Sequence, residues 1–147
     1  MVLNKDFREF LKLLAKHKIK YLVVGGYAVG FHGYPRYTKD LDIWVKPEKK
    51  NAERTLKLLD DFGFGTSGIT IEDLNTKGKF ILLGTPPNRI DLVTSCDGIE
   101  FDECYSQKVL VDIGKIKVNF IDLENLKKNK KAVNRAQDIA DLKNLEE

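Results

Sequence analysis

YLVVGGYAVGFHGYPRYTKDLDIWVK, which spans residues 21–46, predicts a strand, a glycine turn, a short helix, a loop and a second strand. In a strand, alternate side chains point to the same face. Asp40 and Asp42 should therefore project together, with Trp44 beyond them, while the apolar residues between them point to the opposite face. Two neighbouring carboxylates on a largely apolar strand repel each other, and a divalent cation bound by oxygen ligands relieves that repulsion.

The glycines of the same stretch favour a ligand site over the alternative, in which the aspartates only decorate a solvated sheet face. Gly25 and Gly26 end an apolar run, and glycine lets the backbone turn tightly and approach a ligand closely. A short helix predicted over residues 27–31 follows, and its N-terminal amides would favour an anion. A phosphate at the glycines and a metal at the aspartates are what a nucleoside triphosphate needs.

A third carboxylate, Asp91, lies in the predicted strand RIDLV at 89–93. The ordered set GGYA at 25–28, RYTKDLD at 36–42 and RIDLV resembles the DNA polymerase beta-like nucleotidyltransferase superfamily. The pattern is most similar to small prokaryotic members related to abortive-infection type toxin nucleotidyltransferases, and it extends from about residue 20 to the C-terminus. One departure is Gly26, where many members have serine, so backbone amides or Thr38 would have to replace that hydroxyl.

The resemblance implies an α+β nucleotidyltransferase fold, with a mixed central β-sheet, helices packed mainly on one face and a C-terminal helical pair. It also implies that three aspartates are catalytic and hold two Mg²⁺ ions: Asp40, Asp42 and Asp91. The expected nucleotide-binding residues are Gly25, Gly26, Arg36, Thr38, Lys128 and Arg135. For Arg36 the alternative is a structural ion pair, and for the basic run at 127–131 it is a solvated helix end.

These residues together predict transfer of a nucleoside monophosphate from a nucleoside triphosphate to an acceptor hydroxyl. The acceptor could be an RNA or tRNA 3′ end, a protein or a small molecule, and the resemblance adds a toxin–antitoxin partner protein as a candidate. The alternative hypothesis is a catalytically inactive nucleotidyltransferase fold that acts as a binding module.

Length and composition predict a single domain over residues 1–147, large enough for a hydrophobic core. The net charge of +3 is too small to prove nucleic-acid binding. The charged, amphipathic start is unlike a signal peptide, and no apolar run approaches the roughly 20 residues that span a bilayer. We therefore expect a cytoplasmic protein that does not enter the membrane, with Cys96 and Cys104 as reduced thiols.

Hydrophobic periodicity and capping signals predict the remaining elements. The expected helices span residues 4–17, 48–62, 99–104, 122–131 and 134–145, and the expected strands span 19–24, 79–83, 89–94, 107–113 and 115–121. If the strand at 89–94 lies beside the one at 41–45, Asp91 joins Asp40 and Asp42 in one cluster.

Overall fold

The computed structural model describes residues 3–33, 38–63, 68–85 and 87–146. Its helices are α1 (Lys5–Lys16), α2 (Gly25–Phe31), α3 (Lys49–Asp61), α4 (Ile71–Asn75), α5 (Phe101–Ser106), α6 (Leu123–Val133) and α7 (Ala136–Glu146). Its strands are β1 (Tyr21–Val24), β2 (Leu41–Val45), β3 (Phe80–Leu83), β4 (Ile90–Val93), β5 (Val109–Ile113) and β6 (Ile116–Phe120).

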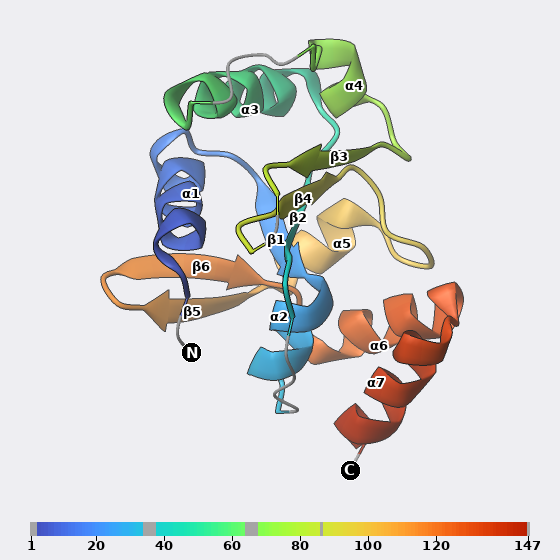
Figure 1. Cartoon of the computed structure of the whole chain (residues 1–147). Helices are drawn as coiled ribbons and strands as arrows, with labels where there is room; N and C mark the ends of the chain where they lie inside the picture. Colours follow the sequence, from blue (N-terminus) through green and yellow to red (C-terminus); the bar gives the residue numbers. More distant parts are fainter. Residues whose placement is uncertain (1–2, 34–37, 64–67, 86, 147) are drawn as a thin grey trace.

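All of these strands form one mixed sheet in the order β3-β4-β2-β1-β6-β5 (Figure 1). β2 pairs with β4 and β1 pairs with β6 in parallel, whereas the β1–β2, β3–β4 and β5–β6 pairs are antiparallel. The predicted α+β class and mixed central sheet are confirmed, and so are the two hairpins expected at β3–β4 and β5–β6. The parallel pairing of β2 with β4 brings together segments that are about 50 residues apart in the sequence.

Local chemistry explains where the helices begin. The side chain of Asn4 accepts a hydrogen bond of 2.8 Å from the amide of Phe7, which caps α1. Asn51 of α3 is buried and bonds both backbone groups of Lys20, at 2.8 and 3.0 Å. The side-chain amide of Asn51 therefore joins α3 to Lys20, the residue before β1.

The glycine pair lies in a different element from the one predicted. Gly25 and Gly26 do not form a separate turn, because α2 begins at Gly25 directly after β1. Gly25 has a φ of 68°, a left-handed conformation that glycine adopts without steric cost. The change of direction therefore takes place at the first residue of the helix.

The two faces of β2 differ in chemistry, as the alternation predicted. Leu41, Ile43 and Val45 are buried on one face. Trp44 follows Asp42 on the other face, where its ring packs edge-on against Phe101 of α5 with the centroids 5.1 Å apart. Since Trp44 is 2% exposed, it is a packing residue. It does not line the cleft described below.

The predicted C-terminal helical pair is present. Asp122 caps α6 by accepting from the amide of Asn125, and α6 ends at Asn134, which has a φ of 57°. A left-handed residue is a common helix end, and it turns the chain into α7. Figure 1 shows α6 and α7 side by side, below and to the right of the sheet.

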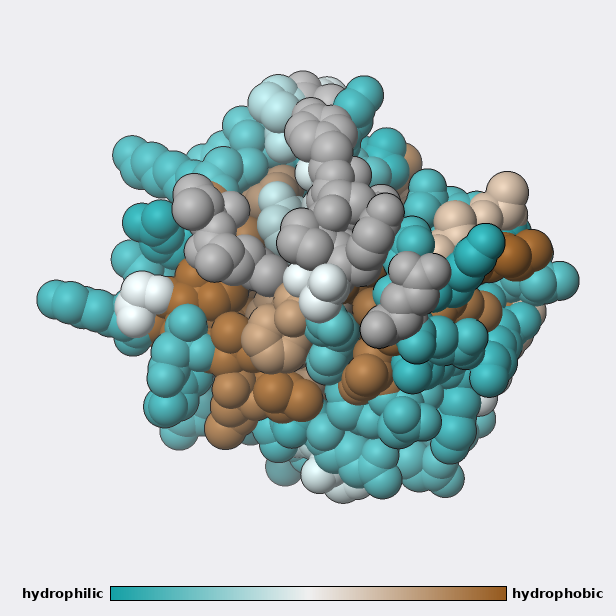
Figure 2. Space-filling model, turned by 90° about the horizontal axis from the view of Figure 1, so that it is seen from below, coloured by the Kyte–Doolittle hydropathy of each residue, from teal (hydrophilic) through white to brown (hydrophobic). Residues whose placement is uncertain are grey.

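In the described part of the chain, no helix has both the length and the apolar character that crossing a membrane requires. Figure 2, which views the molecule from below, shows a largely hydrophilic surface with smaller hydrophobic patches between the charged groups.

Candidate functional site

Asp42 and Asp91 lie directly opposite each other on the adjacent parallel strands β2 and β4. Residues paired in this way point to the same face of a sheet, so the third carboxylate lies on the predicted side. Burial raises the pKa of Asp42 to about 7, and the charge and hydrogen bond of Asp91 and the charge of Asp40 contribute to this rise. The pair therefore forms an acidic centre, with Asp91 buried and Asp42 half-buried, that gains from added positive charge.

Gly25 borders the acidic centre at the end of β1. Val24 is the strand partner of Asp42, so the first residue of α2 lies next to that carboxylate. A Cβ atom placed on Gly25 would overlap Oδ2 of Asp42. The absence of a side chain at Gly25 therefore allows the backbone to approach Asp42 closely.

We expect Gly25→Ala to cost about 2–5 kcal/mol of stability, the sum of a left-handed alanine and an overpacked contact with Asp42. Gly114 is a matched control because its φ is 64° and no atom lies within 4 Å of the position that a Cβ would take there. Urea unfolding of both variants separates the two costs, since Gly114→Ala should lose only about 1–2 kcal/mol. Equal losses in the two variants would contradict the close approach of Gly25 to Asp42.

Arg89 is the main partner of the acidic centre. Its Nε donates to Oδ1 of Asp91 at 2.9 Å, and Nη2 donates to Oδ2 of Asp91 at 3.0 Å and to Oδ2 of Asp40 at 2.9 Å. This bidentate geometry is typical of arginine with carboxylates, and the hydrogen bond to Asp91 raises the pKa of Arg89. The guanidinium therefore links two of the three predicted catalytic residues.

The acidic centre lies at the bottom of a cleft of about 440 Å³ between the sheet and the C-terminal helices. From the sheet side the cleft is lined by Gly25, Asp40, Asp42, Phe80, Arg89, Asp91 and the residues after β4. From the helical side it is lined by Asn129, Lys130, Val133, Arg135 and Asp138. The sheet wall therefore carries three carboxylates with Arg89, and the opposite wall, here called the cationic wall, carries Lys130 and Arg135 with Asp138.

Lys130 is the buried cation of that opposite wall. Its Nζ lies 3.1 Å from Oδ1 of Asp138 and 3.0 Å from Oδ2 of Asp141, and all three side chains are at most 6% exposed. Arg135 also bonds Asp138, at 2.9 Å, while remaining 73% exposed. Burial alone would raise the pKa of Asp138, but the hydrogen bonds from Arg135 and Lys130 lower it. This network fixes α7 against α6 and holds Arg135 at the cleft.

Four further residues were predicted to bind the nucleotide. Thr38 precedes the acidic centre and its hydroxyl donates to the carbonyl of Asp40 at 3.3 Å. Gly26 is buried in α2, and Lys128 lies on α6 but does not line the cleft. Arg36 lies outside the described residues. The nucleotide-binding roles of these four residues remain predictions.

Two cleft residues were not assigned a role from the sequence, although a signal for each exists. Arg89 is two positions before Asp91, so strand alternation places both on one face. Lys130 follows the buried Leu126 by four positions, which places it on the inner face of α6. Lys127 follows Leu123 by the same interval, so periodicity places both lysines toward the inner face, and the structure shows that Lys130 is the buried one.

Mg²⁺ requires oxygen ligands that point toward one ion. Among the described residues, no three His, Cys, Asp or Glu side chains are arranged so that they hold one metal ion. Asp42 and Asp91 already meet, but Asp40 and both oxygens of Asp91 are bound to Arg89. The donor chemistry fits a hard cation, because all three ligands are carboxylates and their mutual repulsion contributes to the raised pKa of Asp42. A three-ligand site would require Arg89 to release both Asp40 and Asp91.

Comparisons with solved structures agree with this fold. The lincosamide antibiotic adenylyltransferase LnuA, solved with lincomycin bound, matches 99% of this chain and 97% of its own, with a TM-score of 0.59 and 14% identity. The Thermotoga maritima protein TM1012, assigned to the nucleotidyltransferases, matches 94% and 88%, with a TM-score of 0.64 and 16% identity. The chain has the nucleotidyltransferase fold.

A further structure with this nucleotidyltransferase fold is the antibiotic-resistance factor ANT(2'')-Ia, which matches over 95% of this chain and 80% of its own. Its TM-score is 0.57 at 13% identity. No protein-family model matches the sequence, and no curated protein matches it significantly. At these identities the likeness concerns the fold, and the activity has to be argued from the cleft.

Proposed function

We propose that the chain is a metal-dependent nucleotidyltransferase that moves a nucleoside monophosphate from a nucleoside triphosphate to an acceptor hydroxyl. The observation that carries this proposal is the register of Asp42 with Asp91, on adjacent parallel strands beside Gly25. A purely structural sheet gains nothing from placing Asp42 beside the buried Asp91, because burial and the neighbouring carboxylates disfavour the charged form of Asp42. A carboxyl group perturbed in this way and placed in a cleft is typical of functional sites.

The reaction forms a bond between the acceptor oxygen and the α-phosphorus. The bond from that phosphorus to the bridging oxygen breaks, pyrophosphate leaves, and the hydroxyl proton passes to Asp91 or to water. Two Mg²⁺ ions held by Asp40, Asp42 and Asp91 would supply stabilisation of the negative charge on the attacking and leaving oxygens. The chain itself orients the two substrates on opposite sides of the acidic centre.

The triphosphate is placed at the cationic wall. Gly25 permits a close backbone approach, and Arg135 presents an exposed guanidinium that matches phosphate oxygens. Lys130 contributes positive charge from within the same wall, although it is already paired with two aspartates. In this arrangement the acceptor approaches from the side of β4, because Asp91 is the carboxylate farthest from Gly25 in strand order.

The test uses triphosphates labelled at the α-phosphate, with Mg²⁺, total tRNA, cell lysate and a small-molecule panel as acceptors. We expect Mg²⁺-dependent label transfer, and we expect Asp91→Asn to reduce it by about 1,000-fold, which is about 4 kcal/mol of transition-state stabilisation. Asp112→Asn is the matched control, because Asp112 is exposed on β5 and pairs only with Lys117 in the contacts described. Transfer onto a co-purifying protein would favour the toxin–antitoxin form of the hypothesis.

The alternative, an inactive binding module, predicts a different result. In that case calorimetry would show no Mg²⁺-dependent triphosphate binding by the unaltered protein. Transfer that is equal in the unaltered protein and in Asp91→Asn would also contradict the proposed catalytic role of the acidic centre.

A further inference from the structure

β3 forms one edge of the sheet, and in the described part of the chain no strand pairs with its outer side (Figure 1). On its inner side the amide of Thr94 donates to the carbonyl of Lys79 at 3.1 Å, so Lys79 turns its backbone toward β4. In an antiparallel ladder the direction of the backbone hydrogen bonds alternates from residue to residue. The N–H and C=O groups of Phe80 and Leu82 therefore point outward, away from β4.

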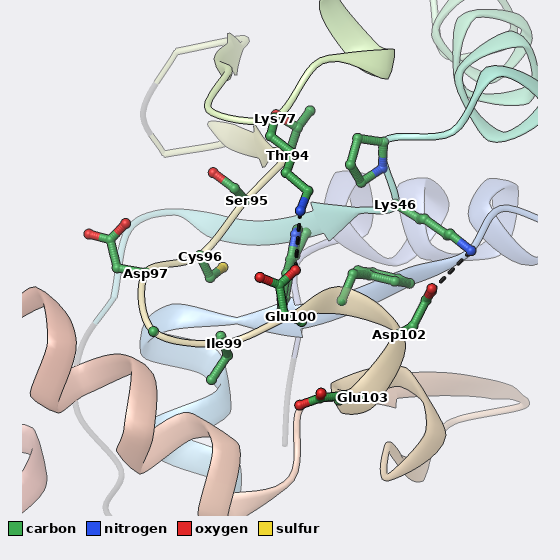
Figure 3. Close-up of a pocket in the computed structure, with 14 residues that line it drawn as sticks. Lys46, Lys77, Thr94, Ser95, Cys96, Asp97, Ile99, Glu100, Asp102 and Glu103 are labelled. Carbon is green, nitrogen blue, oxygen red and sulfur yellow. Dashed lines mark hydrogen bonds and ion pairs between the residues drawn. The ribbon is translucent and has the colours of Figure 1, made fainter.

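The side chains at this edge are apolar and exposed. Phe80 and Leu82 are 61% and 53% exposed, and they share one face of β3 because they are two residues apart. Natural edge strands are usually protected by charged side chains or proline, and β3 contains neither. Of the two lysines before β3, Lys77 is held by Glu100 at 3.2 Å (Figure 3), and Lys79 is on the face opposite to Phe80. The edge is therefore an open template for another strand.

The opposite edge of the sheet, β5, is protected. Ile113 and Ile116 face each other at the hairpin turn, so the preceding residue, Asp112, turns its backbone outward. Asp112 is exposed and pairs with Lys117 at 3.1 Å. A copy of β3 added at β5 would place its apolar residues beside this charged pair. Pairing of β3 with β3 avoids the charges, and it closes as a two-fold dimer instead of growing into a filament.

We propose that the chain associates with a second copy of itself through β3, which pairs antiparallel with the partner's β3 across a two-fold axis. Outward backbone groups must meet outward groups, so Phe80 lies opposite the partner's Leu82 and Ile81 lies on the axis. The exposed side chains then meet as apolar cross-strand pairs. The two copies of Lys79 lie at opposite ends of the ladder, about 14 Å apart along the strands, which exceeds the Debye length of about 8 Å.

This pairing brings a residue of the second copy to the cleft. Leu82 lies opposite Asp91 on β4, and Asp91 lies opposite Asp42 on β2. The partner's Phe80 continues this row on the same face of the sheet. Neighbouring strands are about 4.8 Å apart, so the partner's Phe80 lies about 10 Å from Asp91. It borders the side from which the acceptor approaches, a consequence that rests on the proposed nucleotidyl transfer, whereas the association itself does not.

The size of the contact predicts a weak dimer. A standard stable interface buries about 800 Å² on each partner, and a strand of four residues provides less than that. We therefore expect a reversible equilibrium between monomer and dimer, with a dissociation constant on the order of 100 µM.

Sedimentation velocity of the full chain from about 1 µM to about 1 mM measures this equilibrium without any substrate. Leu82→Lys should weaken association at least about tenfold, because a charge would then lie beside the partner's Phe80. Leu110→Lys is the matched control, since Leu110 is 57% exposed on the other edge strand, and it should change the dissociation constant by less than about twofold. A monomer at every concentration, growth beyond the dimer, or equal effects of the two variants would overturn the proposal.

Cross-linking through Ile81→Cys tests the register. Antiparallel partners that are not hydrogen-bonded to each other have Cα atoms about 4.5 Å apart, a distance that a disulfide spans. Under mild oxidation Ile81→Cys should form a covalent dimer. Leu110→Cys and the unaltered protein, whose thiols are Cys96 and Cys104, should remain uncross-linked. Equal cross-linking of Ile81→Cys and Leu110→Cys would contradict the pairing of β3 with β3.

Sedimentation and cross-linking are both independent of catalysis. If the dimer forms but no Mg²⁺-dependent triphosphate binding is found, the proposed transfer fails while the association stands. If transfer occurs and the protein remains a monomer at every concentration, the association fails while the proposed transfer stands.

Discussion

Asp42→Asn is expected to stabilise the metal-free protein above neutral pH and, at the same time, to reduce nucleotidyl transfer by about 1,000-fold or more. The loss of transfer follows from the proposed metal-binding role of Asp42. The gain in stability follows from its surroundings, because burial and the neighbouring Asp91 raise the pKa of Asp42 to about 7. Asparagine has a similar shape but carries no charge.

The sign of the pH dependence follows from proton binding. The unfolded chain releases the Asp42 proton near pH 4, but the folded chain keeps it until about pH 7. Between these values the folded state holds more protons, so the stability of the unaltered protein falls as pH rises. The shift of roughly three pH units corresponds to at most about 4 kcal/mol by pH 8, which Asp42→Asn should recover.

Urea unfolding at several pH values, in buffer with a chelator, measures this difference. The gap in unfolding free energy between Asp42→Asn and the unaltered protein should widen from pH 5 to pH 8. Asp112→Asn should show no such trend, since Asp112 is exposed. Added Mg²⁺ should stabilise the unaltered protein but not Asp42→Asn. A constant gap across this pH range would contradict the buried acidic centre.

Lys130→Met is expected to destabilise the protein by about 3–5 kcal/mol, because two buried carboxylates lose their shared cation. Asp138 keeps its contacts with Arg135, whereas Asp141 is fully buried and loses the Lys130 contact of 3.0 Å. The α6–α7 pairing depends on these ion pairs. The last helix should therefore open first, and Arg135 should leave the cleft with it.

Urea unfolding gives the overall cost, and limited proteolysis reports the opening of α7. Lys131→Met is the matched control, since Lys131 is the next residue of α6 and is exposed. It should change stability by less than about 0.5 kcal/mol. Similar losses in the two variants, or protection of α7 in Lys130→Met, would show that the buried ion pairs do not hold the helices together.

Much of this architecture was predictable because it depends on local patterns. Strand alternation predicted that Asp42 and Trp44 share one face of β2 and that Arg89 and Asp91 share one side of the next strand. The same alternation was applied to Asp40, but β2 begins at Leu41, so Asp40 precedes the strand. Capping residues marked the starts of α1 and α6 to within a residue. The start of α2 at Gly25 was missed, since two consecutive glycines favour a turn over a helix in the absence of tertiary contacts.

The sequence by itself thus determined most of the elements and the strand faces on which Asp42 and Asp91 lie. Only the tertiary structure decided that β4 lies beside β2 in parallel, which places Asp91 opposite Asp42. It also decided that Arg89 bridges to Asp40, that Lys130 is the buried lysine of its run, and that Gly25 touches Asp42. The physical reason is that periodicity gives the direction of a side chain from its own backbone, whereas its partners depend on which distant segments pack together.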